Sequence, residues 1–268
     1  MGRALPNQIR IFALIAALVL VQGCNERDQL EKEAPALARA DLKVDRIAIA
    51  GVVSDVATLG DSTKSRERWS LLVGNHLGRE RFGKLPIMSF GEVRATLVPD
   101  DYGLMLDRFK DDGGCDSAVL AELHTVLDGK ARFIAFGNIQ EDRIEWSESD
   151  VEVVDKKTKA TTKTRTMTTS RTTWVRLRFY DLATQQLAWD HRTFGQSARS
   201  KEHDMSDVIE HDPKEGFVGG LVTSIVNSAI KPDPKYPATP ELEQSLANAF
   251  DNVGVYLKPS KKRQEDGR

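Results

Sequence analysis

Two cysteines carry the most reactive side chains of this 268-residue sequence. Cys24 ends the string Val21-Gln22-Gly23-Cys24, with a small glycine before it and a polar stretch after it. A thiolate is a nucleophile, so a cysteine at a processing boundary can accept a covalent group. Cys115 is the other cysteine. We expect it to be an inert or partly buried thiol, with no internal disulfide in the mature chain.

The segment before Cys24 has the order of a secretory signal. Arg3 and Arg10 form a basic start, and an apolar run follows at residues 11–21. This run is about half of the roughly 20 residues that a membrane-spanning helix needs, which favours a cleaved signal over a permanent span. We therefore predict a signal peptide at residues 1–23, cut before Cys24.

The string that ends at Cys24 resembles the lipobox of bacterial lipoproteins, which implies a diacylglycerol on the cysteine thiol. The protein would then be attached to a membrane of the cell envelope through this lipid. Asn25 follows the cysteine, whereas Asp at that place is the retention signal of enteric lipoproteins. We expect the periplasmic face of the outer membrane, with the inner membrane as an open alternative. A soluble periplasmic protein with a chance cysteine is the other alternative.

Several histidines and carboxylates are candidate metal ligands. The densest titratable group consists of His203, Asp204, Asp207, Glu210, His211 and Asp212. Imidazole nitrogens and carboxylate oxygens can bind a divalent metal, but this spacing matches no diagnostic motif, and a solvated polar loop explains it equally well. We predict no metal and no cofactor. His191, beside Trp189, is interpreted as a half-exposed sheet residue, and His76 and His124 as structural histidines on helices.

Composition and motifs argue against two classes of function. Lys and Arg total 38 against 40 acidic residues, so the chain lacks the positive field with which proteins bind nucleic acid. We find no Gly-x-Ser-x-Gly elbow and no His-Glu-x-x-His pair, and we predict that the protein is not an enzyme. A periplasmic hydrolase that uses an unfamiliar carboxylate pair stays open as an alternative. The apolar content of 40% is sufficient for a real core.

The first half of the chain must provide the framework for any site. Two segments, 46–53 and 131–139, are apolar on both faces, as in central strands, and 86–90 is a shorter strand. Apolar stripes at helical spacing predict helices around 69–77, 102–109 and 120–127, the last capped by Asp116 or Ser117. Alternating strands and helices predict an α/β fold, a single mixed sheet with helices packed on its faces.

A long charged and Thr-rich segment predicts a protruding β-hairpin. Its first arm is mainly acidic and its second arm mainly basic. A turn at 155–160 would set Glu152 opposite Lys163 and Asp150 opposite Arg165, each pair contributing about 0.2–1 kcal/mol. On the second arm, Thr and Ser alternate with mostly Lys and Arg, so neither face is apolar. Trp146 and Trp174 could anchor a partner at the hairpin base or pack on the sheet.

The rest of the chain predicts another hairpin and two helices. Segments 174–180 and 187–194 pair through the turn at 181–186, and 201–215 forms a polar loop. An apolar helix at 217–229 docks on the sheet. A last short helix, capped by Thr239 and started by Pro240, bears Leu242, Leu246 and Phe250.

These elements divide the chain into five parts. We expect a signal peptide at 1–23, a tether at 24–45, an α/β domain at 46–230 that includes the extended hairpin at 141–180, a Pro-rich linker and terminal helix at 231–257, and a disordered tail at 258–268.

The order of several strings over residues 46–229 resembles one group of envelope proteins. The strings are Ile47-Ala48-Ile49-Ala50-Gly51, Lys84-Leu85-Pro86, Asp128-Gly129-Lys130-Ala131, Phe133-Ile134-Ala135-Phe136-Gly137 and Tyr180-Asp181-Leu182-Ala183-Thr184 followed by Trp189. This pattern resembles the superfamily of small α/β lipoprotein domains that includes the curli secretion channel subunit, the lipoprotein activators of penicillin-binding proteins and the N-terminal domain of the Tol-Pal β-propeller protein. Gln185 stands where the family's turn has Gly, which disfavours a tight left-handed turn.

The resemblance implies a mixed sheet with helices on its faces, and a function in binding other envelope proteins or copies of the same chain. It implies no enzymatic turnover. The curli-channel branch forms an oligomeric outer-membrane pore with extended hairpins, and this is our runner-up interpretation. The sequence argues against it, because a lipid-facing strand needs an apolar outer face and this hairpin has Thr on one side and Lys and Arg on the other.

Overall fold

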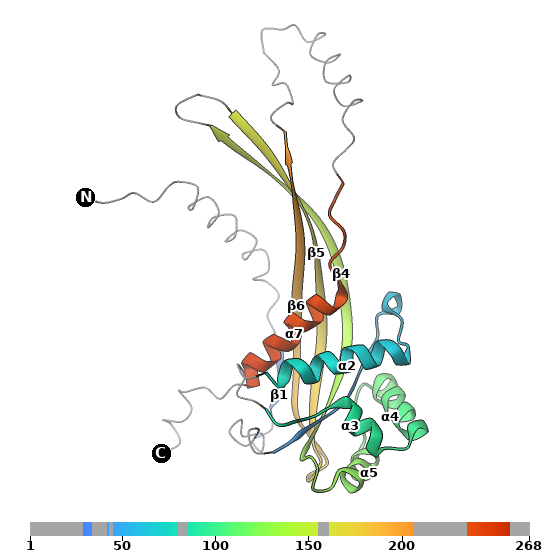
Figure 1. Ribbon diagram of the computed structural model, residues 1–268. Helices are drawn as coiled ribbons and strands as arrows, with labels where there is room; N and C mark the ends of the chain where they lie inside the picture. The colour runs from blue at the N-terminus through green and yellow to red at the C-terminus, as the bar shows by residue number, and fades with distance from the viewer. Residues whose placement is uncertain are drawn as a thin grey trace, which may run out of the picture.

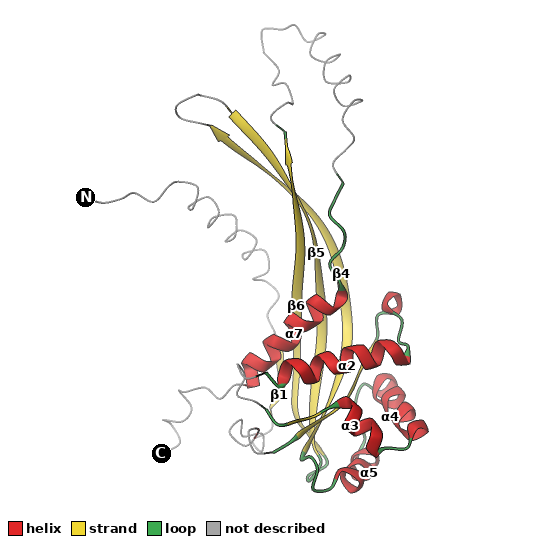
Figure 2. Ribbon diagram, in the orientation of Figure 1, coloured by secondary structure: helices red, strands yellow, loops and turns green. Residues whose placement is uncertain are grey.

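The computed structural model of the protein describes residues 29–33, 42, 45–79, 85–154, 161–205 and 235–257. This part of the chain forms one open mixed sheet of six strands with helices on its faces, which confirms the expected α/β class (Figures 1 and 2). The strand order is β1-β6-β5-β4-β2-β3.

The strands are β1 (Gln29–Glu33), β2 (Ile47–Ser54), β3 (Ile87–Met88), β4 (Phe133–Val154), β5 (Thr161–Asp181) and β6 (Gln186–Asp204). The helices are α2 (Thr63–Leu77), α3 (Phe90–Thr96), α4 (Pro99–Asp112), α5 (Ser117–Leu127) and α7 (Leu242–Leu257), with a short 3-10 turn at Ala57–Leu59. Among the residues described, no helix is long and apolar enough to cross a membrane.

β2 lies in the most deeply buried part of the sheet. All eight of its residues are buried, and it runs parallel to both β3 and β4. α4 approaches it so closely that a Cβ atom on Gly51 would lie 3.0 Å from Leu106 and from the Tyr102 hydroxyl. That hydroxyl donates a hydrogen bond of 2.6 Å to the carbonyl of Ala50. The apolar run predicted as a central strand therefore lies at the centre of the core.

Helix ends are fixed by the residue types that ordinarily cap helices. Ser62 caps α2, and Asp116 caps α5 by accepting a hydrogen bond from the Val119 amide, as predicted. Ser89 and Glu92 form a reciprocal capping box at α3. Each cap satisfies backbone donors that the first helical turn leaves unpaired.

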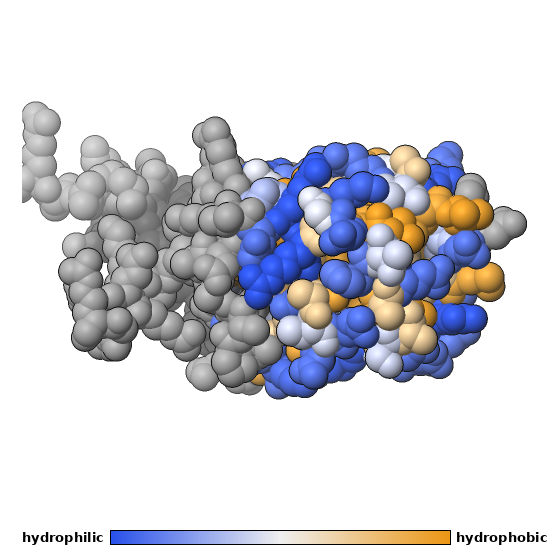
Figure 3. Space-filling view, turned by 90° about the horizontal axis from the view of Figure 1, so that it is seen from below, coloured by the Kyte–Doolittle hydropathy of each residue, from blue (hydrophilic) through white to orange (hydrophobic). Residues whose placement is uncertain are grey.

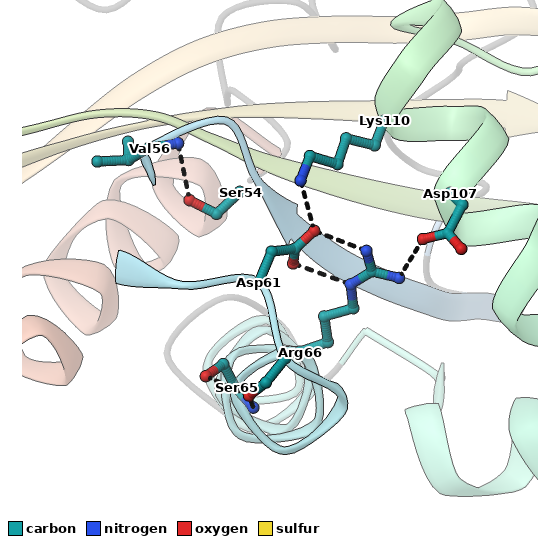
Figure 4. A network of polar contacts seen from close by, with 8 residues as sticks. Ser54, Val56, Asp61, Ser65, Arg66, Asp107 and Lys110 are labelled. Carbon is teal, nitrogen blue, oxygen red and sulfur yellow. Dashed lines mark hydrogen bonds and ion pairs between the residues drawn. The ribbon is translucent and has the colours of Figure 1, made fainter. Parts of the chain in front are cut away.

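An ion-pair cluster joins the start of α2 to α4 (Figure 4). Asp61 accepts hydrogen bonds from Arg66 at 2.6 and 2.8 Å and from Lys110 at 2.8 Å, while Arg66 also pairs with Asp107 at 2.8 Å. Burial opposes ionisation of Asp61, but the hydrogen bonds from Arg66 and Lys110 outweigh it and lower the pKa of this carboxyl. The cluster fixes the two helices relative to each other.

α7 packs on β6, β5 and α2, and together with α2 it crosses the strands (Figure 1). Its side chains Leu246, Phe250 and Val253 are fully buried. The contact with β6 is closest at Gly195, where a Cβ atom would lie 1.9 Å from the Ser245 carbonyl oxygen. The terminal helix was predicted to be short, but it has 16 residues and belongs to the core.

Two expected boundaries are wrong. Residues 29–33, expected as part of the tether, form β1 and pair with β6, with Gln29 opposite Arg192. β6 continues to Asp204, into the segment expected as a polar loop from residue 201, because β5 provides hydrogen-bond partners along its whole length. Backbone pairing therefore orders polar residues that show no apolar period.

The turn between β5 and β6 differs from expectation as well. Gln185 adopts a left-handed backbone with φ 55°, although glutamine disfavours it. The flanking pairs between Asp181 and Gln186 and between Tyr180 and Leu187 hold the strands together and impose this conformation.

Other expectations lie outside the described residues. They are the signal peptide and Cys24, the turn at 155–160, the apolar helix at 217–229 and the tail at 258–268.

Candidate interaction surface

The upper part of the sheet forms a three-stranded antiparallel ribbon that extends beyond the helices (Figure 1). We call it the stem and define it as residues 140–154 of β4, 161–173 of β5 and 193–204 of β6. A bulge between Ile139 and Glu141 marks its start, where the pairing of β2 with β4 also ends. β4 is therefore a single strand that is buried in the domain and continues into the predicted hairpin.

Among the described residues, the stem has two edges without a strand partner. β2 pairs with β4 only as far as Ile139, and β1 pairs with β6 only as far as Arg192. Beyond these points, within the part of the chain that the structure describes, the outer backbone edges of β4 and β6 have no strand partner. The lower part of the β6 edge is covered by α7, where Asn252 and Asn248 donate hydrogen bonds to the carbonyls of Phe194 and Gln196. Unpaired amide and carbonyl groups along an edge are a template for another strand.

The predicted hairpin register is confirmed. Glu152 lies opposite Lys163, and Asp150 lies opposite Arg165. The Arg165 guanidinium donates two hydrogen bonds to the Asp150 carboxylate, at 2.8 and 3.0 Å, and these bonds raise the pKa of Arg165. Acid on one arm and base on the other thus specify the alignment of two long strands that have little apolar pattern.

One face of the stem is tied to the segment that leads into α7. Arg171 donates two hydrogen bonds to Asp142 at 2.7 and 2.8 Å, and their side chains are only 13% and 5% exposed. Arg171 also donates to the carbonyl of Pro240. Thr169 donates to the carbonyl of Pro237, and Thr173 shares a 2.6 Å hydrogen bond with Ser245.

The opposite face is covered by hydroxyl groups. By strand alternation it presents Thr164, Thr166, Thr168, Ser170 and Thr172 of β5, beside Ser147 and Ser149 of β4 and Ser200 of β6. Thr168 and Ser200 share a hydrogen bond of 2.8 Å. The described stem therefore has no apolar face, as the sequence predicts, and burying it in lipid would be costly.

Two exposed apolar side chains lie on β4, one of the two outer strands of the stem. Ile144 is 37% exposed and Trp146 is 58% exposed. Their position on β4 places them on the same face as Tyr236, whose hydroxyl donates to Glu148 at 2.8 Å. An exposed tryptophan beside an open strand edge is typical of a surface that another protein covers.

The second candidate tryptophan is part of the packing. Trp174 is 3% exposed, its ring lies 4.8 Å from that of Phe194, and the Arg192 guanidinium lies over it at 4.3 Å. Of the two tryptophans that the sequence singled out, only Trp146 is available to a partner.

A pocket of about 250 Å³ lies at the base of the stem, beside the end of α4. It is lined by Asp55, Asn138, Arg176 and Arg178, among others. Both arginines donate to Asp190, and the Asn138 amide donates to Asp55 at 2.7 Å. The hydrogen bond with Asp190 raises the pKa of Arg176. The sequence analysis did not predict this pocket, although Arg176 and Arg178 alternate with apolar residues on a strand and could have indicated a polar face. Asp55, Arg176 and Arg178 already have partners, and we assign the pocket no ligand.

The histidines and Cys115 have structural surroundings. His191 is fully buried between the rings of Trp189 and Tyr256, rather than half-exposed as expected. His76 hydrogen-bonds with Asp251 at 2.7 Å, as expected of a structural histidine. Burial raises the pKa of Cys115 to about 12, so its thiol is protonated at neutral pH.

The structure describes only some of the candidate metal ligands, and it does not describe the expected lipid site. His203 and Asp204 lie at the end of β6, and residues 207–212 and Cys24 lie outside the described part. Over the residues that are described, no group of three potential ligands could hold a metal ion.

The surface at the opposite end from the stem tip is mainly hydrophilic where it is coloured, with hydrophobic residues in small separate patches (Figure 3).

Comparison with known proteins gives weak likenesses in structure alone. No protein family and no curated protein matches the sequence. The PelC dodecamer from Paraburkholderia phytofirmans is 12% identical and covers 87% of this chain and 100% of its own, with a TM-score of 0.38. The lipoprotein GNA1162 from Neisseria meningitidis is 13% identical and covers 71% and 99%, with a TM-score of 0.25. The LpoB C-terminal domain from Salmonella enterica is 8% identical and covers 59% and 83%, with a TM-score of 0.25. At these TM-scores, the function has to be argued from the residues themselves.

Proposed function

We propose that the protein is a lipoprotein of the bacterial envelope, held at the periplasmic face of the outer membrane by lipid on Cys24, which acts by protein–protein contact through its stem. The observation that carries the proposal is the open outer edge of β4 beyond Ile139, beside exposed Ile144 and Trp146. A partner strand can add to such an edge through main-chain hydrogen bonds, while the exposed side chains give specificity. The proposal includes no catalytic turnover and no cofactor.

Photo-crosslinking in a diderm bacterium tests the contact. We would place a photoreactive phenylalanine at Trp146 and, as a matched control, at Leu104 of α4; the native residues are 58% and 56% exposed. We expect a discrete adduct from position 146 and none from position 104. Equal labelling at both positions, or none at 146, would contradict the assignment of the stem as the contact surface.

The anchor is tested in the same cells by labelling with a palmitate analogue. We expect label on the wild type and none on Cys24→Ser, with the labelled protein in the outer-membrane fraction. Unlabelled, soluble wild-type protein would refute the lipid anchor and leave a soluble binding protein or an enzyme as the alternatives.

The second candidate is a subunit of an oligomeric export pore. It is favoured by one observation: the two edges without a strand partner belong to different strands, β4 and the part of β6 beyond Gln196, so one copy could add to the next in a head-to-tail manner. The size of the detergent-solubilised protein separates the two candidates. A large ring with crosslinks between identical chains supports the pore, whereas a monomer with crosslinks to other proteins supports the first proposal.

A further inference from the structure

Three exposed apolar residues lie on β1 and in the last turn of α7, at the β1 edge of the sheet, and β1 is the described element that follows Cys24 most closely in the sequence (Figure 1). Leu30 on β1 is 45% exposed, and Val255 and Tyr256 in the last turn of α7 are 62% and 39% exposed. Leu30 pairs with His191 of β6, whose ring lies 4.4 Å from the ring of Tyr256. Paired residues on neighbouring strands point to the same face, so Leu30 and Tyr256 flank His191 on that face. We call these three residues the edge patch.

The chain length before β1 limits how far the edge patch can be from the anchor. Five residue steps separate Cys24 from Gln29, where β1 begins. Even a fully extended chain of that length spans only about 17 Å. A lipid on Cys24 therefore keeps the β1 edge close to the bilayer surface, because β1 is hydrogen-bonded to β6. The stem tip is not constrained in this way.

The sequence that follows α7 is basic. α7 ends at Leu257, directly after the edge patch, and the sequence continues with Lys258, Lys261, Lys262 and Arg263. Basic residues beside an apolar surface favour contact with anionic lipid headgroups. Tyrosine is enriched at membrane interfaces, because its ring is apolar and its hydroxyl is polar.

We infer that the edge patch contacts the membrane and fixes the orientation of the lipidated protein, with Leu30, Val255 and Tyr256 at the level of the lipid headgroups. This inference rests on the proposed lipid anchor at Cys24. The lipid chains hold the protein on the bilayer. The edge patch determines which side of the domain faces the bilayer and leaves the stem free for a protein partner. Single exposed apolar residues elsewhere, such as Val98 and Leu104, belong to α4 or precede it, and α4 lies away from β1 (Figure 1).

Fluorescence quenching by brominated lipid tests the inference with full-length lipidated protein. In a Cys115→Ala background, an environment-sensitive dye is attached at Val255→Cys or at the control Val98→Cys, whose native residues are 62% and 61% exposed. The vesicles contain phosphatidylethanolamine and phosphatidylglycerol with bromine near the headgroups. We expect at least twofold quenching at position 255, increasing with the phosphatidylglycerol fraction, and little quenching at position 98.

The failure of this inference can be distinguished from the failure of the anchor. The palmitate analogue is measured in the same preparation, so unlabelled protein refutes the anchor itself. In labelled protein, equal quenching at the two positions, or a change at position 255 only when periplasmic proteins are added, would overturn the edge patch as a membrane contact. The variant Leu30→Asp should keep the palmitate label and lose at least half of the quenching at position 255.

Discussion

The base of the sheet and the stem are made by the same strands but held together by different forces. In the base, β4 and β5 are covered by helices and bury Phe136, Val175 and Phe179 completely. In the stem, the same strands present hydroxyl and charged side chains, and their alignment depends on pairs such as Arg165 with Asp150. The base is thus stabilised mainly by apolar burial, whereas the stem depends on backbone pairing and on the base from which it extends.

The largest loss in the free energy of unfolding is expected from a substitution in the base of the sheet. Phe136→Ala removes a fully buried ring that stacks on Phe109 at 4.7 Å and meets Tyr180 edge to face at 5.9 Å. The cavity should destabilise the protein by about 3–5 kcal/mol in urea unfolding. Ile144→Ala in the stem should cost less than about 1 kcal/mol, because that side chain is 37% exposed. Similar losses for the two variants would contradict the distinction between base and stem.

Gly195→Ala tests the boundary between the two regions. A Cβ atom would lie 1.9 Å from the Ser245 carbonyl oxygen and 2.3 Å from the Ala249 amide nitrogen, so α7 has to move away from β6. We expect a loss of about 3 kcal/mol in unfolding free energy and faster hydrogen exchange in α7. Gly103→Ala is the control, because nothing lies within 4 Å of its Cβ position, and it should stabilise the helix slightly. Unchanged exchange in α7 would show that the close contact is wrong.

Within the stem, the contribution of an ion pair to the free energy of unfolding should depend on how deeply the pair is buried. Asp142→Asn leaves the Arg171 guanidinium, only 13% exposed, without its carboxylate, and should cost about 2 kcal/mol. Asp150→Asn breaks the pair with Arg165, where the side chains are 32% and 38% exposed, and should cost less than about 0.5 kcal/mol. Thermal unfolding of the two variants checks the order, and equal losses would refute it.

The smallest expected change is a gain. Gln185→Gly relieves a left-handed residue at φ 55° and should raise the unfolding free energy by about 0.5–1 kcal/mol. Gln186→Gly is the matched control, because Gln186 begins β6 in extended backbone, where glycine should be destabilising. Urea midpoints of both variants measure the difference, and a loss at position 185 would mean that the glutamine side chain supports the turn.

The sequence predicted the elements whose patterns are strong. β2 and the first part of β4 are apolar on both faces, and α2, α4 and α5 each carry an apolar stripe. These patterns predicted the layered fold, because a buried strand or a helix face in a core must be apolar at the matching residue spacing. Charge alternation between the arms gave the register of β4 against β5, including both predicted pairs.

The remaining features depend on contacts between distant segments. β1, with the sequence Gln-Leu-Glu-Lys-Glu, has no core-facing pattern and forms because β6 offers an edge. Nothing local to Gly195 indicates that the backbone of α7 packs against it. The difference between Trp146 and Trp174 was not predicted either, because the exposure of each ring depends on its neighbours in space, such as Phe194 and Arg192 around Trp174.

The continuity of β4 has a mechanical consequence. Its 22 residues run without interruption from beneath the helices into the stem, a length of about 70 Å at the usual rise per residue. A force applied to the stem along its axis would load the β4–β5 ladder in shear, so that many backbone hydrogen bonds resist together. A sideways force would instead bend the ribbon beyond Glu148, the outermost stem residue that contacts the segment before α7. We therefore expect the stem to be stiff along its axis and to bend most easily near its tip.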